Sequence, residues 1–118
     1  MLILVTGGAA SGKSEHAERL LCEKAQSRLY LATMQPFGKS AEMRIARHRA
    51  LRAGKGFATV ERTLDLANLR LSQQYDGILL EDLGNLLANE LFAPEGAGAE
   101  SAFDSIVAGV DNLQKYCE

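Results

Sequence analysis

The feature that most constrains the fold is a glycine-rich loop near the amino terminus. Residues 7–14 read GGAASGKS, which fits the pattern G-x-x-x-x-G-K-[ST] in full. An apolar run at residues 2–6 precedes the loop, and a segment with apolar residues at helical spacing follows it. A buried strand, a tight loop and a helix in this order begin a βαβ unit. The loop therefore predicts an α/β fold with a parallel sheet.

The same loop has the residues that bind phosphate. Without a Cβ, glycine lets the backbone N–H groups of such a loop turn inward and donate to phosphate oxygens. The helix that follows adds the positive end of its dipole. Lys13 is predicted to neutralise the β- and γ-phosphates of a nucleotide, and Ser14 Oγ to ligate a bound Mg²⁺. The predicted nucleotide-binding residues of the loop are Gly7, Gly8, Ala9, Ala10, Ser11, Gly12, Lys13 and Ser14.

Beyond the loop, strands alternate with helices. Short apolar runs predict strands at residues 2–6, 28–33, 57–61 and 77–82. Helical spacing predicts helices at residues 14–25, 40–52, 64–74, 85–92 and 101–116, and a turn is expected at residues 35–39. The alternation indicates a mainly parallel sheet covered by helices, in a single nucleotide-binding domain over residues 1–118. Because no strand follows the last predicted helix, we expect a C-terminally incomplete sheet.

Composition excludes several other classes of protein. The net charge of −2 argues against binding nucleic acid or an acidic membrane through bulk attraction. No apolar run approaches the roughly 20 residues that a membrane-spanning helix needs, and the apolar start is too short for a signal peptide. Cys22 and Cys117 fit no metal or disulfide spacing. These observations predict a cytoplasmic protein with two reduced thiols.

A pair of carboxylates ends the predicted strand at residues 77–82. Its sequence, GILLED, delivers Glu81 and Asp82 to the carboxyl edge of the sheet, where ligands bind in open α/β folds. One of the two is expected to reach the Mg²⁺, directly or through water. Spacing leaves both candidates open, since successive side chains of a strand face opposite sides. The alternative is two solvated acids at a strand end.

A basic helix offers a third group of candidate residues. Within residues 42–52, EMRIARHRALR, the side chains of Arg44, His48 and Arg52 recur every four positions and so share one face. A nucleotide site could use this face, with arginines on phosphate and the histidine as nucleophile or base. From composition alone, a solvated basic helix with an incidental histidine is the simpler interpretation.

Four segments together resemble one family. ILVTGGAASGKS, YLAT, EMRIARHR and LLEDLGNLLANELF occur in this order. They resemble the adenosylcobinamide kinase/adenosylcobinamide-phosphate guanylyltransferase family, whose members assemble the nucleotide loop of cobalamin. The resemblance implies a P-loop NTPase-like (RecA-like) three-layer fold, Mg²⁺, GTP or ATP as co-substrate, and a homo-oligomer, a trimer. It implies two activities: phosphorylation of adenosylcobinamide, and transfer of GMP from GTP to adenosylcobinamide phosphate.

The resemblance also assigns roles to individual residues. His48 matches the histidine that carries GMP as a covalent intermediate, and with Lys13 it forms the expected catalytic pair. Glu81 matches the carboxylate that ends the Walker-B-like strand, so it joins Ser14 as an expected magnesium ligand. The other matching positions, all but the last expected to bind nucleotide, are Thr33, Arg44, Arg49, Glu61 and Asn89.

The chain departs from the family pattern at several positions. Ser40 and Ala41 stand where the family has an acidic pair, Phe57 where a tryptophan is usual, and Asp82 where a cysteine is common. Family members also continue with another core strand. Two alternatives therefore stay open beside the bifunctional transferase. One is a truncated, non-catalytic fragment that binds GTP or ATP, and the other is a different P-loop small-molecule kinase in which His48 is incidental.

Overall fold

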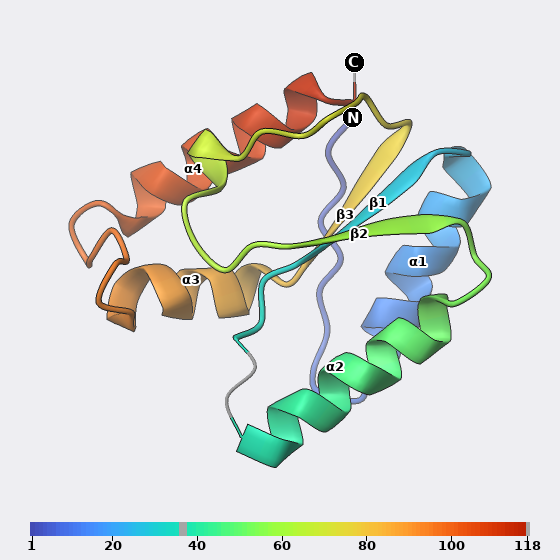
Figure 1. The fold of residues 1–118 in the computed structure, drawn as a ribbon, viewed down its shortest axis with the longest axis horizontal. Helices are drawn as coiled ribbons and strands as arrows, with labels where there is room; N and C mark the ends of the chain where they lie inside the picture. The colour runs from blue at the N-terminus through green and yellow to red at the C-terminus, as the bar shows by residue number, and fades with distance from the viewer. Residues whose placement is uncertain (36–37, 118) are drawn as a thin grey trace.

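The computed structural model describes residues 1–35 and 38–117, which form a three-stranded sheet with two helices on each face (Figure 1). The strand order is β2-β1-β3, so β1 (Arg28–Ala32) lies between β2 (Phe57–Glu61) and β3 (Gly77–Glu81). Both pairings are parallel and run over five residues. The predicted α/β class with a parallel sheet is therefore confirmed.

The helices divide into two layers. On one face lie α1 (Lys13–Lys24) and α2 (Gly38–Arg52), and on the other α3 (Leu83–Phe92) and α4 (Ala102–Lys115) (Figure 1). A single turn of 3₁₀ helix, η1 (Leu66–Asn68), packs against α4. Among these elements, α2 lies in the crossover from β1 to β2 and η1 in the crossover from β2 to β3. Parallel strands need such crossovers, because the chain must return to the same end of the sheet before the next strand begins.

The hydrophobic core lies between the sheet and the second layer. Five leucines, each at most 7% exposed, form its centre: Leu31, Leu66, Leu69, Leu86 and Leu113. Gly109 lets α4 approach η1 closely, since a Cβ at this position would lie 2.6 Å from the Cβ of Leu66. The packing of α4 on η1 thus depends on a residue without a side chain at their point of contact.

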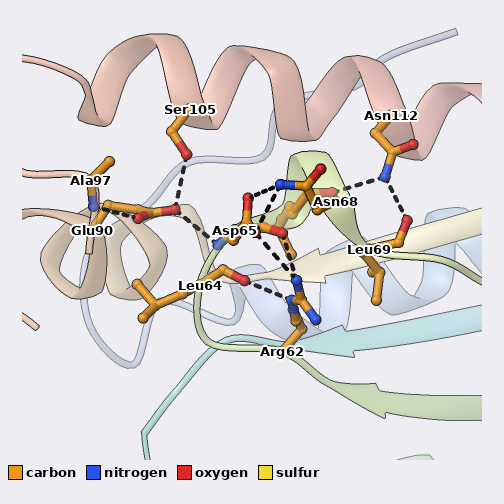
Figure 2. Close-up of polar contacts among 10 residues, drawn as sticks. Arg62, Leu64, Asp65, Asn68, Leu69, Glu90, Ala97, Ser105 and Asn112 are labelled. Carbon is orange, nitrogen blue, oxygen red and sulfur yellow. Dashed lines mark hydrogen bonds and ion pairs between the residues drawn. The ribbon is translucent and has the colours of Figure 1, made fainter. Parts of the chain in front are cut away.

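A buried carboxylate joins this layer to its loops. Glu90 in α3 is 3% exposed. It accepts hydrogen bonds from the Asp65 N–H at 3.0 Å, the Ala97 N–H at 3.0 Å and the Ser105 hydroxyl at 3.1 Å (Figure 2). One side chain thereby binds polar groups from the η1 segment, the α3–α4 loop and α4. A buried charge requires hydrogen-bond partners of this kind.

The prediction of a strand at residues 2–6 is wrong for this structure. Residues 1–8 have no regular secondary structure, and the exposed fractions of Met1, Leu2, Ile3 and Leu4 are 98, 67, 47 and 73%. The run pairs with no strand among residues 1–35 and 38–117. A strand is stabilised by its hydrogen-bonded neighbour and by burial of its side chains, so β-propensity alone does not form one.

The predicted helix at residues 64–74 is also wrong, because only the three residues of η1 are helical. Asp65, directly before η1, has a left-handed φ of 56°, which a regular helix does not accommodate. The carbonyl groups of Leu66 and Leu69 each accept a 2.8 Å hydrogen bond from the Asn112 side chain of α4 (Figure 2). A tertiary contact has taken the place of the next helical turn.

The remaining predicted strands and helices are present, with ends that differ by no more than two residues. The turn expected at residues 35–39 includes residues 36 and 37, which lie outside the described part of the chain. No helix in the described part has both the length and the apolar character needed to cross a membrane.

Candidate functional site

The glycine-rich loop leads directly into α1. Its backbone is turned by two residues in the left-handed region, Ala10 with φ 56° and Gly12 with φ 85°. Residues in this conformation let neighbouring N–H groups point the same way, as in anion-binding nests. Lys13 Nζ donates to the carbonyl oxygen of Gly8 at 3.1 Å, so the ammonium group folds back over the loop. Residues 7–12 are exposed. Loop, ammonium group and helix N-terminus therefore lie together.

Glu81 brings together side chains from four elements. At the end of β3, its carboxylate accepts hydrogen bonds from the hydroxyl groups of Ser14 in α1 and Tyr30 in β1. His48 Nδ1 in α2 lies 3.5 Å from Glu81 Oε2 and 3.4 Å from the Tyr30 hydroxyl oxygen. We call Ser14, Tyr30, His48 and Glu81 the Glu81 cluster. It joins the end of the phosphate-loop motif to the histidine.

The two carboxylates at the end of GILLED have different surroundings. Glu81 faces α1 and α2, as its bond to Ser14 requires. The carboxylate of Asp82 accepts the Asn85 N–H at 2.6 Å and so caps the N-terminus of α3. Only Glu81 of this pair therefore contacts the serine of the loop.

Thr33 and Asn89 bind backbone groups at the carboxyl edge of the sheet. Thr33 is fully buried, and its hydroxyl donates to the Asp82 carbonyl at 2.8 Å and accepts the Asp82 N–H at 2.9 Å. The Asn89 amide donates to the carbonyl groups of Thr33 and Thr63 at 2.8 and 3.0 Å. Together these side chains join the segments that follow the three strands, and thereby fix the backbone next to Glu81.

The arginines of α2 range from exposed to buried. Arg44 is exposed, and Arg49 forms an ion pair with Glu61 of β2 in which both side chains are more than half exposed. Arg52 is only 5% exposed, and its guanidinium carbon lies 3.2 Å from the centre of the Tyr30 ring. Within the described residues, Nε and Nη1 of Arg52 have no hydrogen-bond partner. On the face that Arg44, His48 and Arg52 were predicted to share, Arg44 is therefore exposed and Arg52 is buried.

Sequence reasoning missed Tyr30. It is 2% exposed, and burial, followed by the hydrogen bond and charge of Glu81, holds the pKa of its hydroxyl well above the usual range. The hydroxyl therefore stays protonated and donates to Glu81. Strand alternation contained the signal, because Tyr30 and Ala32 share a face of β1 and Ala32 is the register partner of Glu81.

Two hollows lie near these residues. One, of about 230 Å³, lies at the end of α2 and the start of β2, and its lining includes Arg49, Arg52, Phe57 and Thr59. The other, of about 720 Å³, lies at the carboxyl edge of the sheet beside α3, and its lining includes Gln35, Thr63, Asn89 and Phe92. The first is cationic and aromatic, whereas the second combines amide, hydroxyl, carboxylate and apolar groups.

The donor set at Ser14 and Glu81 fits a magnesium ion shared with phosphate. Mg²⁺ is typically held by one or two carboxylates together with substrate phosphates and water, rather than by an all-protein cage. Ser14 and Glu81 supply a hydroxyl and a carboxylate that touch each other beside the loop. No group of three or more His, Cys, Asp or Glu side chains in the described residues is arranged to hold a metal by itself.

Comparison with known proteins shows the family of this chain. Residues 3–117 match the family described as "Cobinamide kinase / cobinamide phosphate guanyltransferase". The chain belongs to this family. The chain is also similar to individual proteins. It is 40% identical over 106 residues to the bifunctional adenosylcobalamin biosynthesis protein CobU of Salmonella typhimurium, and the matched stretch covers 88% of this chain and 58% of that protein. It is 42% identical over 94 residues to the protein of the same name from Escherichia coli, covering 78% and 51%.

A third relative extends the similarity. The bifunctional adenosylcobalamin biosynthesis protein CobP of Pseudomonas aeruginosa is 42% identical over 80 residues, covering 67% of this chain and 46% of that protein. The chain spans about half the length of the curated relatives it matches. The family resemblance predicted from the sequence is confirmed, while the roles of individual residues in this cobinamide kinase / guanyltransferase family member stay predictions.

Proposed function

We propose that this chain binds GTP at the loop of residues 7–14 and takes up GMP on His48, as a transferase of cobalamin biosynthesis. The reaction sequence would be phosphorylation of adenosylcobinamide, followed by transfer of GMP to adenosylcobinamide phosphate. The observation that carries the proposal is the Glu81 cluster, in which the histidine lies beside the carboxylate that contacts Ser14. The relatives are bifunctional adenosylcobalamin biosynthesis proteins, which supports the same pathway.

Nucleotide binding would divide between two parts of the site. Lys13 and the α1 N-terminus would hold the β- and γ-phosphates. Ser14 and Glu81 would hold Mg²⁺, which supplies neutralisation of phosphate charge when bound. The cationic hollow at the end of α2 suits the remaining parts of the nucleotide. Further nucleotide contacts are proposed for Thr33, Arg44, Arg49 and Glu61.

In the guanylyl step, an unprotonated ring nitrogen of His48 attacks the α-phosphorus of GTP. A P–N bond forms, and the bond from the α-phosphorus to the bridging oxygen breaks, so that pyrophosphate leaves with the electron pair. Lys13 stabilises the negative charge that develops on the leaving group. An oxygen of the acceptor phosphate then attacks the same phosphorus, the P–N bond breaks, and His48 is restored as a neutral imidazole.

In the kinase step, the γ-phosphoryl group of GTP or ATP passes to the hydroxyl of the aminopropanol arm of adenosylcobinamide. Such transfers need little from the protein beyond positioning and charge neutralisation, which the loop and Lys13 would provide.

Because both steps consume GTP or ATP, we place the protein in the cytoplasm. We also propose the homo-oligomeric state, a trimer, that the family resemblance implies.

The test is covalent labelling. The protein, His48→Ala and the control His16→Ala are each incubated with Mg²⁺ and GTP labelled at the α-phosphate. His16 lies exposed on α1, so its loss should not matter. We expect acid-labile, base-stable label on the wild type and the control but not on His48→Ala. GTP binding without label on any variant would favour a non-catalytic nucleotide-binding chain. Phosphoryl transfer to an unrelated acceptor, again without label, would favour a different P-loop kinase.

A further inference from the structure

The Glu81 cluster constrains where its protons lie. An ionised carboxylate only accepts hydrogen bonds, so in the contact between Tyr30 and Glu81 the tyrosine hydroxyl is the donor. A tyrosine hydroxyl has one proton, and this contact uses it. Toward His48 Nδ1, which lies 3.4 Å away, the tyrosine oxygen can therefore only accept. Glu81 Oε2, 3.5 Å from the same nitrogen, also only accepts.

With two acceptors facing it, Nδ1 of His48 is the ring nitrogen expected to carry the proton. A neutral imidazole has a single N–H, and the tautomer is set by the hydrogen bond that one ring nitrogen makes. We propose that Tyr30 is a positioning residue: with its hydroxyl committed to Glu81, it holds His48 as the Nδ1–H tautomer and leaves Nε2 as the nucleophilic nitrogen. That Nε2 attacks GTP rests on the proposed function, whereas the tautomer does not.

Tyr30 is held firmly enough for this role. Its ring is covered on one face by the Arg52 guanidinium, 3.2 Å from the ring centre, and meets Phe57 edge-on with 6.4 Å between centroids. The residue is 2% exposed, so water has little access to it. Burial and the carboxylate also keep the pKa of the hydroxyl high, which preserves it as a donor. Three elements, β1, β2 and α2, thus fix the oxygen that faces His48.

The first test is the tautomer itself, in the nucleotide-free protein. Long-range ¹H–¹⁵N NMR of ring-labelled histidine, above the pH at which histidine is protonated, distinguishes a protonated from an unprotonated ring nitrogen. We expect His48 to show an N–H at Nδ1 and an unprotonated Nε2, with exposed His16 as internal reference. His48→Ala assigns the signals. A wild-type His48 protonated at Nε2 would overturn the proposal, and this spectrum requires no variant of Tyr30.

The second test removes the hydroxyl. Tyr30→Phe should keep GTP affinity but lower the rate of GMP labelling about ten- to hundredfold, the loss expected when a reacting group is no longer oriented. Its His48 signals should move toward a mixture of tautomers. Tyr75→Phe is the matched control, because Tyr75 lies before the start of β3, at the opposite end of this strand from Glu81. Unchanged labelling and an unchanged tautomer in Tyr30→Phe would assign the positioning to Glu81 alone and overturn the role of Tyr30.

The two tests separate this inference from the function it rests on. Absence of label on the wild type, with His48 protonated at Nδ1, would refute guanylyl transfer but leave the hydrogen-bond arrangement standing. Label on the wild type, with His48 protonated at Nε2, would refute the arrangement and leave guanylyl transfer standing.

Discussion

The two faces of the sheet are covered by different kinds of side chain. The face under α3 and α4 is filled by leucines, and its buried carboxylate, Glu90, has three hydrogen-bond donors around it. The face under α1 and α2 buries Tyr30 and Arg52, and places Glu81 between hydroxyl groups and a histidine. Two guanidinium nitrogens of Arg52 lack partners in the described part of the chain.

From this difference we predict which face dominates stability and which face carries the proposed nucleotide chemistry. Burial of apolar side chains is the main favourable term in folding, so the α3/α4 face should dominate stability. Polar groups kept close together, or left without partners, cost free energy and are typical of functional sites. Changes on the first face should therefore affect the free energy of unfolding, and changes on the second should mainly affect nucleotide chemistry.

The largest expected effect is in the leucine core. Leu86 is fully buried, whereas its neighbour Leu87 in α3 is 43% exposed. Leu86→Ala should lower the free energy of unfolding by about 2–5 kcal/mol, because it removes buried methyl groups and leaves a cavity. Leu87→Ala is the control and should cost about 1 kcal/mol or less. Urea denaturation measures both, and equal losses would contradict the assignment of stability to this face.

The next effect concerns the buried carboxylate of the same face. Glu90→Ala leaves the N–H groups of Asp65 and Ala97 without their acceptor, which should lower the free energy of unfolding by about 1–3 kcal/mol in total. Glu90→Gln keeps the size and one acceptor oxygen, so its loss should be smaller. Glu100→Ala, at an exposed position, is the control. Denaturation as above gives the ranking, and an unaffected Glu90→Ala would mean that water satisfies these groups.

On the other face, Lys13→Ala should separate binding from stability. Nucleotide affinity should fall at least about tenfold, or about 1.4 kcal/mol, because the β- and γ-phosphates lose their ammonium partner. The free energy of unfolding should change by no more than about 0.5 kcal/mol, as for other substitutions outside the core. Calorimetric titration with GTP and urea denaturation supply the two numbers. Lys24→Ala, exposed at the other end of α1, controls for loss of charge, and equal GTP affinity in both variants would refute the role of Lys13.

The smallest expected effect concerns Asp76, which lies directly before β3. Backbone N–H groups of Ser27 and Gln26, in that order of effect, hold the pKa of Asp76 below its ordinary value of 3.8. A lowered pKa stabilises the fold above pH 3.8 and loses that contribution as the pH falls through the folded-state value. Asp76→Asn should therefore flatten the pH dependence of stability below about pH 4. Asp111→Asn, exposed on α4, is the control, and identical acid profiles in wild type and both variants would contradict the prediction.

Local sequence patterns accounted for most of the elements but not for all. The loop at residues 7–14, the α2 helix with His48, and the strands that became β1, β2 and β3 follow from short-range periodicity and glycine placement. Residues 2–6 and 64–74 have equally clear patterns and did not form the predicted elements. Their conformation depends on partners distant in sequence, such as Asn112 for the carbonyl groups of Leu66 and Leu69.

The sequence by itself was enough to predict the parallel α/β class and the family, both of which are confirmed, while phosphate binding at the loop stays a prediction. Only the tertiary structure decided that Glu81, rather than Asp82, contacts Ser14, and that Tyr30 completes the contact between Glu81 and His48. The physical reason is distance along the chain. Backbone preferences act over a few residues, whereas these contacts join β1, α2 and β3 and exist only because the strand order places β1 beside β3.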